Sequence, residues 1–158
     1  MQTYEALPSR VIFGAGAVAQ VATEVDRFGA SRVVLIDGLF DEALRARIEA
    51  DLGGRHAGTI TEVAQHVPAE VAARALAQAR AVNADALVAL GGGSATGLAK
   101  AIALETGVPI LAIPTTYAGS EMTPIWGITA NGRKTTGSDP RWLPRAVVYD
   151  PGLVLSLP

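Results

Sequence analysis

Short apolar runs alternate along this chain with longer stretches in which apolar residues recur every three or four positions. A run of four or five apolar residues suits a strand that is buried on both faces, and the longer periodic stretches suit helices that cover it. Such alternation is typical of successive βαβ units. The pattern therefore predicts an α/β, Rossmann-like, mostly parallel sheet flanked by helices, in one domain over residues 1–158.

Turn residues and apolar spacing set the bounds of the predicted elements. Strands are expected over residues 11–13, 32–36, 59–63, 86–90, 109–113 and 146–149. Helices are expected over residues 17–28, 41–52, 68–83 and 95–105. Further on, Asn131-Gly132 separates two short β-like segments, 124–129 and 133–136. Because Asn-Gly favours a tight primed turn, the sequence predicts a small β-hairpin there.

Composition and charge exclude several classes of protein. The chain has 13 Lys and Arg against 15 Asp and Glu, so its net charge of −2 does not suit a strongly basic nucleic-acid binder. It has no Cys, which excludes disulfides, thiolate zinc sites and cysteine nucleophiles. No apolar run reaches the roughly 18 residues of a membrane span, and residues 1–8 do not form a secretory signal. We expect a cytoplasmic protein with no nucleic-acid or membrane partner.

The most specific local feature is the segment Gly91-Gly92-Gly93-Ser94, which joins the predicted strand 86–90 to a helix. Glycines let a bound group approach the backbone, and the free N–H groups of a helix N-terminus attract an anion such as a pyrophosphate. The alternative is a tight strand-to-helix turn without a ligand. A P-loop is excluded because Leu98 stands where that motif needs Lys. We favour phosphate binding at this turn.

A second glycine turn, Gly14-Ala15-Gly16, matches the spacing of the dinucleotide fingerprint, with Asp37 roughly 20 residues further on. The strand before it is very short, and we interpret this segment as a structural turn only. Asp37, at the end of a buried strand, has two alternative roles. Its carboxylate can accept the hydroxyls of an adenosine ribose, which would favour NAD over NADP, or it can cap the helix that begins near Asp41.

Polar residues also follow the predicted strand 109–113, at the edge of the sheet where α/β proteins bind ligands. Thr115, Thr116 and Gly119 can contact phosphate or ribose without filling a cleft. Lys134, on the second arm of the predicted hairpin, either reaches the same cleft or is a solvated surface lysine. The two histidines, His56 and His66, share no helical face, so no metal site is expected. We find no complete catalytic set.

Several segments, in collinear order over essentially the whole chain, resemble the N-terminal half of iron-type (group III) alcohol dehydrogenases. They are Phe13–Ala17, Gly91–Leu104, Ala112–Thr116, Gly119–Thr123 and Tyr149–Pro158. Gly97 and the loop Pro114–Gly127 are most similar to the maleylacetate reductase subgroup. The resemblance implies a dehydroquinate-synthase-like fold, in which this chain is the N-terminal nucleotide-binding domain and a C-terminal helical domain is missing.

The resemblance also implies a set of cofactor-binding residues for NADH or NADPH. These are Gly92, Gly93, Ser94 and Ala95 for the pyrophosphate, Asp37 for the ribose, and Thr115, Thr116, Tyr117 and Lys134. Asp37 is expected to favour NADH. The loop after Thr116 is one residue shorter than the family pattern, so Tyr117 and Ala118 occupy the region of a family threonine.

The implied activity is that of an oxidoreductase of aromatic-compound catabolism. Maleylacetate reductases reduce the carbon–carbon double bond of maleylacetate to give 3-oxoadipate, and are expected to be homodimers that need no metal. The groups that bind the substrate and donate the proton would lie in the missing domain, so this chain is expected to be inactive alone. The alternatives are the N-terminal domain of a metal-dependent group III alcohol dehydrogenase, or a stand-alone nucleotide-binding module.

Overall fold

One parallel sheet forms the centre of the protein. The structure, a computed structural model, describes residues 9–155 and 157. The strands, in their order across the sheet, are β1 (Arg10–Phe13), β8 (Ala146–Tyr149), β5 (Ile110–Pro114), β4 (Ala86–Gly91), β2 (Val33–Asp37) and β3 (His56–Ile60). Every pairing between neighbours is parallel. The predicted α/β, Rossmann-like class is confirmed.

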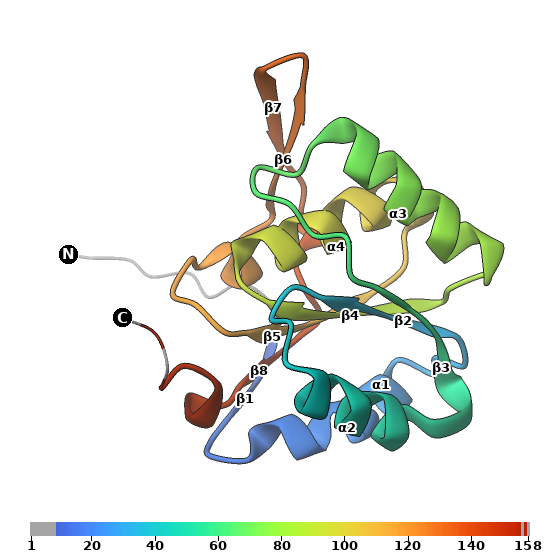
Figure 1. The fold of residues 1–158 in the computed structure, drawn as a ribbon, viewed down its shortest axis with the longest axis vertical. Coiled ribbons are helices and arrows are strands. Elements are labelled where there is room, and N and C mark those ends of the chain that lie inside the picture. The colour runs from blue at the N-terminus through green and yellow to red at the C-terminus, as the bar shows by residue number, and fades with distance from the viewer. Residues whose placement is uncertain (1–8, 156, 158) are drawn as a thin grey trace.

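Two helices cover each face of this sheet (Figure 1). They are α1 (Val21–Arg27) and α2 (Glu42–Leu52) on one face, and α3 (Ala69–Ala81) and α4 (Gly93–Thr106) on the other. Strands β2, β4 and β5 are buried along their whole length, and their alternating side chains enter the two apolar cores. None of the described helices is long and apolar enough to cross a membrane.

The order of the strands creates a switch point between β2 and β4. The chain passes from β2 outward to β3 through α2, and from β4 in the opposite direction to β5 through α4. Ligands of open α/β sheets bind at the carboxyl ends of the strands beside such a point. Here those ends come close together, since the N–H of Gly38 donates to the carbonyl of Leu90 at 2.8 Å.

Several predicted boundaries differ from the structure by one to four residues, and three of these differences are informative. The strand predicted over residues 59–63 is wrong by three residues, because the edge strand β3 pairs His56–Ile60 with β2 and is mostly only half-buried, without a diagnostic apolar run. The helix predicted over 17–28 begins as a 3₁₀ turn, Ala17–Gln20, and becomes α-helical only at Val21. Helix α4 starts at Gly93 instead of residue 95, which places Gly93 and Ser94 in its first turn.

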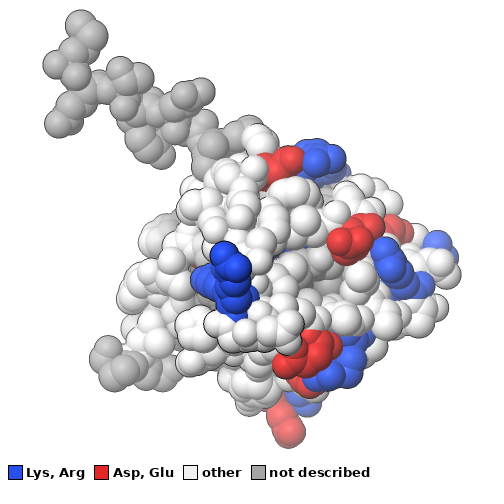
Figure 2. All heavy atoms as spheres, turned by 90° about the horizontal axis from the view of Figure 1, so that it is seen from above, with Lys and Arg blue, Asp and Glu red and all other residues white. Residues whose placement is uncertain are grey.

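The predicted hairpin is confirmed. Strands β6 (Ile125–Ala130) and β7 (Arg133–Ser138) pair antiparallel and project beyond α4 (Figure 1). Asn131 and Gly132 have φ values of 51° and 72°, as a primed turn requires. Seen from above, basic and acidic side chains lie close to one another along one side of the molecule, and no extended patch of a single sign covers this face (Figure 2).

Candidate functional site

The first turn of α4 is open to a ligand. Its N-cap, Gly92, provides no side-chain cap, and the first helical hydrogen bond runs from the N–H of Thr96 to the carbonyl of Gly92. The N–H groups of residues 93–95 therefore have no partner within the helix, and they carry the positive end of its dipole. Such a turn can receive an anion such as a phosphate.

Two glycines let a neighbouring loop close against this turn. A Cβ atom at Gly92 would lie 3.0 Å from the side chain of Thr116, and one at Gly93 would lie 3.1 Å from Cβ of Ala118. Real Cβ atoms seldom approach other atoms so closely. The turn and the loop after β5 therefore form one packed unit in which any larger residue would push the loop outward.

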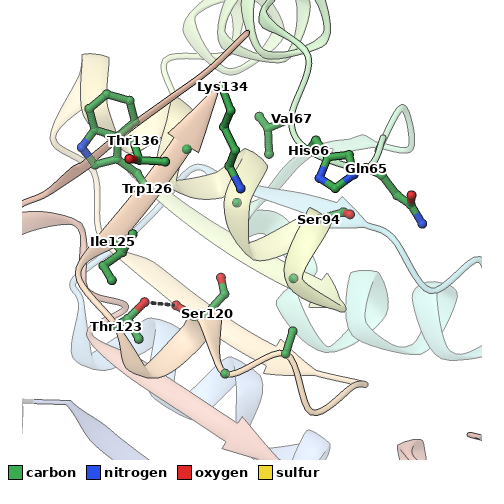
Figure 3. A pocket seen from close by; sticks show the side chains of 15 residues that line it. Gln65, His66, Val67, Ser94, Ser120, Thr123, Ile125, Trp126, Lys134 and Thr136 are labelled. Carbon is green, nitrogen blue, oxygen red and sulfur yellow. Dashed lines mark hydrogen bonds between the residues drawn. The ribbon is translucent and has the colours of Figure 1, made fainter. Parts of the chain in front are cut away.

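A cavity of about 580 Å³ lies in front of this turn. Its walls come from the loop before α3, the first turns of α4, the loop after β5 and the hairpin (Figure 3). The lining residues are Gln65, His66, Val67, Gly93, Ser94, Gly97, Ala118, Gly119, Ser120, Thr123, Ile125, Trp126, Gly127, Lys134 and Thr136. The volume and the mixed polar and apolar lining suit part of an extended ligand such as a dinucleotide.

Lys134 brings a positive charge into this cavity. Its side chain extends from the hairpin toward α4 (Figure 3). A Cβ atom at Gly127, on the neighbouring strand, would lie only 2.6 Å from Cε of Lys134, so the lysine stem crosses the hairpin where no side chain stands. Lys134 is exposed and also lines the cavity, so its contact with a ligand stays a prediction.

Asp37 is completely buried at the end of β2. Its Oδ1 accepts the N–H groups of Leu39 and Phe40, both at 3.1 Å, and Oδ2 accepts from Nη1 of Arg45 at 3.2 Å. The second predicted role is wrong, because α2 is capped by Asp41, which accepts the N–H of Leu44 at 3.0 Å. Asp37 instead holds the turn beside the cleft, and its contact with a ribose stays a prediction.

The remaining predicted residues separate into two groups. Thr116 and the 85%-exposed Tyr117 line a second, more apolar cavity of about 310 Å³, together with Phe13 and Tyr149. The side chains of Thr115 and Ala95 are buried and line neither cavity. The N–H of Thr115 donates to the carbonyl of Gly91 at 3.0 Å and so ties the loop to the glycine turn.

The cavity wall contains a strained turn that the sequence pattern does not predict. His66 and Val67 have φ values of 63° and 48°, and the left-handed conformation is unusual for a β-branched residue. Thr129 of the hairpin holds both residues through bonds to their carbonyls, of 2.8 and 3.0 Å. Val67 packs over Gly97, where a Cβ atom would lie 2.9 Å from its Cγ2. No local sequence signal announces a left-handed valine.

A buried polar cluster behind the loop was also missed. Lys100 has no exposed surface, and its Nζ donates to three backbone carbonyls of the loop. Burial lowers the pKa of Lys100 from 10.5 to about 8, against the opposing effect of the Glu121 charge. The Tyr149 hydroxyl donates to Glu121 at 2.7 Å, and burial followed by this bond raises the pKa of that phenol far above its usual range.

The first glycine turn is filled from within the protein. The N–H groups of Gly16 and Val18 donate to Oδ1 and Oδ2 of Asp150, at 3.1 and 3.2 Å. An internal carboxylate thus takes the place of a bound anion, which supports our interpretation of this segment as a structural turn. Among residues 9–155 and 157, no group of three or more His, Cys, Asp or Glu side chains is arranged to hold a metal ion.

Comparisons with known proteins agree on one family. The family model described as iron-containing alcohol dehydrogenase matches residues 8–151. Maleylacetate reductase of Burkholderia cepacia is 52% identical over 98% of this chain and 44% of its own length. The crystal structure of maleylacetate reductase from Agrobacterium tumefaciens matches with a TM-score of 0.92 and 49% identity, over all of this chain and 46% of that one.

A more distant structure contains a nucleotide. Sulfoacetaldehyde reductase from Bifidobacterium kashiwanohense, in complex with NAD⁺, matches with a TM-score of 0.88 and 25% identity, over all of this chain and 48% of that one. This chain therefore spans a little under half the length of the relatives that it matches.

Proposed function

Because the chain belongs to the iron-containing alcohol dehydrogenase family, we propose that it is the NAD(P)H-binding domain of a maleylacetate reductase. The observation that carries this proposal is the open first turn of α4, which faces a cavity of about 580 Å³ at the switch point of the sheet. Glycines at which a side chain would crowd the neighbouring loop, and the lysine across the cavity, suit a pyrophosphate. Similarity to maleylacetate reductases at 44–52% identity supports the subgroup.

Each segment of the site has a proposed role toward the dinucleotide. The N–H groups of Gly93, Ser94 and Ala95, beside Gly92, bind the pyrophosphate, and Lys134 adds a positive charge. The nicotinamide extends toward the loop of Thr115, Thr116 and Tyr117, between the two cavities. The bound cofactor supplies a hydride, and the residues of this chain hold it at the edge of the sheet.

Asp37 is proposed to act at the adenosine ribose. It fixes the turn at residues 38–40 and places a negative charge beneath it, which disfavours a 2′-phosphate and so favours NADH. Arg45 lies 3.2 Å from this carboxylate and reduces that discrimination. We therefore propose a moderate preference for NADH over NADPH.

The proposed reaction of the whole enzyme is the reduction of the carbon–carbon double bond of maleylacetate to give 3-oxoadipate, in the breakdown of aromatic compounds. The groups that bind the two substrate carboxylates and donate the proton are proposed to lie in the part of such enzymes that this chain does not span. On this proposal the enzyme acts as a homodimer and the chain binds nucleotide without turning over substrate.

Calorimetric titration of the purified chain with NADH tests the proposal directly. We expect binding at a single site, and weaker binding of NADPH under the same conditions. A folded chain, verified by circular dichroism, that binds neither nucleotide at millimolar concentration would overturn the proposed function. Adding maleylacetate to the NADH complex should produce no oxidation of the cofactor, measured by its absorbance.

A further inference from the structure

Lys100 is the largest polar side chain without exposed surface in the described part of the molecule. Its Nζ donates to the carbonyls of Ser120 and Thr123, both at 2.6 Å, and of Ile125 at 2.8 Å. An ammonium group has three N–H donors and no acceptor, so three carbonyls satisfy it completely. Burying a lysine is costly unless such bonds compensate, and here they all come from one short loop segment.

That segment forms the wall between the two cavities. Ser120, Thr123 and Ile125 line the larger cavity, Glu121 lines the smaller one, and Gly119 lines both. Regular structure within the wall is limited to one 3₁₀ turn, Ser120–Met122, so its backbone has little internal support. The bonds from Lys100 join the first residue of this turn, the residue that follows it and the start of β6 to the middle of α4.

We propose that Lys100 is a positioning residue for the nucleotide site, whose ammonium group fixes the loop wall against the first turn of α4. The role toward a nucleotide rests on the proposed function, whereas the position of the loop wall can be measured without a nucleotide. Lys100 and the turn residue Gly93 lie on the same helix, so one rigid element carries both the phosphate cradle and the group that places the opposite wall. The loop and the first turn of α4 meet at Ala118, whose Cβ would lie 3.1 Å from a Cβ atom added at Gly93.

The protonation state of Lys100 determines how many carbonyls it can hold. Its pKa of about 8 means that the ammonium form is lost just above neutral pH. A neutral amine has two N–H donors, so one of the three carbonyls loses its partner. The titratable groups facing it are Glu121, from the 3₁₀ turn, and behind it Tyr149, from β8, which stays neutral throughout this range because its pKa is raised. The wall should therefore loosen between pH 7 and 9.5.

Tryptophan fluorescence reports on this change without a nucleotide. The chain has two tryptophans, and Trp126 directly follows Ile125 and packs edge-to-face on Trp142, with ring centroids 6.1 Å apart. We expect a fluorescence transition with a midpoint near pH 8 in the wild-type chain, and a severalfold loss of NADH affinity over the same range. Lys100→Met should abolish the transition and weaken NADH binding about tenfold at pH 7. Lys134→Met should keep the transition although it weakens binding.

Chemical rescue distinguishes the effect of the ammonium charge at position 100 from the effect of side-chain packing there. Because the chain contains no cysteine, Lys100→Cys introduces a single thiol, which can be aminoethylated in denaturant before refolding. The refolded product should regain both the transition and the affinity, whereas the same variant capped with an uncharged ethyl group should not. These wild-type and rescued proteins decide the question even where Lys100→Met fails to fold.

The proposed function and the role of Lys100 can be contradicted independently. A wild-type chain that shows the transition but binds no NADH contradicts the proposed function and leaves the wall assignment supported. A wild-type chain that binds NADH with constant affinity and constant fluorescence from pH 7 to 9.5 contradicts the loss of the Lys100 proton in this range. Equal NADH affinity of the aminoethylated and ethylated proteins overturns the positioning role of Lys100.

Discussion

Two glycine turns join a parallel strand to a helix in this protein, and they differ in what their amide groups bind. At Gly14–Gly16, the carboxylate of Asp150 accepts the N–H groups of Gly16 and Val18, which lie 134 and 132 positions away in the sequence. At Gly91–Gly93, no side chain caps the helix and the amides face a cavity. The first turn follows an edge strand, whereas the second lies at the switch point of the sheet.

The comparison shows that the spacing of glycines does not by itself identify a nucleotide site. The first turn has the fingerprint spacing and the second does not, yet only the second leaves donors for a ligand. What separates them is a distant carboxylate in one case and the convergence of two central strands in the other. Substitutions at the two turns and around the cavity test this difference.

Filling the open turn should have the largest effect. In Gly93→Val, the new side chain meets Ala118 at 3.1 Å and stands over the free amides, so NADH affinity should fall about 100-fold or more, measured by calorimetry. Gly58→Val is the matched control, because Gly58 lies in β3 with open space around it and does not line the cavity. Equal affinities of the two variants would place the phosphate elsewhere.

Emptying the filled turn should cost stability. Asp150→Ala removes the charged acceptor of Gly16 and Val18, so the free energy of unfolding should fall by about 2 kcal/mol, measured in urea. Asp150→Asn keeps one oxygen acceptor and should lose roughly half as much. If both variants are as stable as the wild type, the carboxylate is not what holds the first turn.

Removing the charge opposite the open turn should weaken binding moderately. Lys134→Met keeps the stem across Gly127 and should reduce NADH affinity about fivefold at low salt and less at high salt. Gly127→Ala should resemble it, because the added methyl group displaces the stem. An affinity that rises in Lys134→Met would exclude contact between this lysine and the phosphates.

Removing the charge of Asp37, which holds the turn at residues 38–40, should alter the preference between NADH and NADPH more than the affinity for either. In Asp37→Asn, the loss of the carboxylate frees Arg45 and lowers the repulsion of a 2′-phosphate, so the NADH-to-NADPH affinity ratio should fall about threefold. The two affinities are measured on the same preparation. An unchanged ratio would mean that Asp37 only supports the turn.

The buried Lys100 makes stability depend on pH. Folding lowers the pKa of Lys100 from 10.5 to about 8. Between these two pH values the unfolded chain binds more protons than the folded chain, so the free energy of unfolding increases with pH. The cost of burying the charge is fully present below pH 8. The unfolding free energy of the wild type minus that of Lys100→Met should therefore increase from pH 7.5 to 9.5, as measured in urea. A decrease would contradict the assigned direction.

The sequence predicted those features that depend on local pattern. The buried strands, the primed turn at Asn131-Gly132 and the glycine turn before α4 all followed from apolar runs and turn chemistry. The edge strand β3 was misplaced because its half-buried residues carry little pattern. Asp150 and Lys100 were overlooked as partners because their contacts join distant segments, and a lysine is ordinarily expected at the surface.

The most direct test of the contrast between the turns is an amide ¹H–¹⁵N spectrum of the chain recorded during titration with NADH. The open-turn account predicts the largest shifts at the amides of Gly93, Ser94 and Ala95, with little change at Gly16 and Val18, whose N–H groups stay bound to Asp150. Large shifts at Gly16 and Val18, with the α4 amides unmoved, would contradict it.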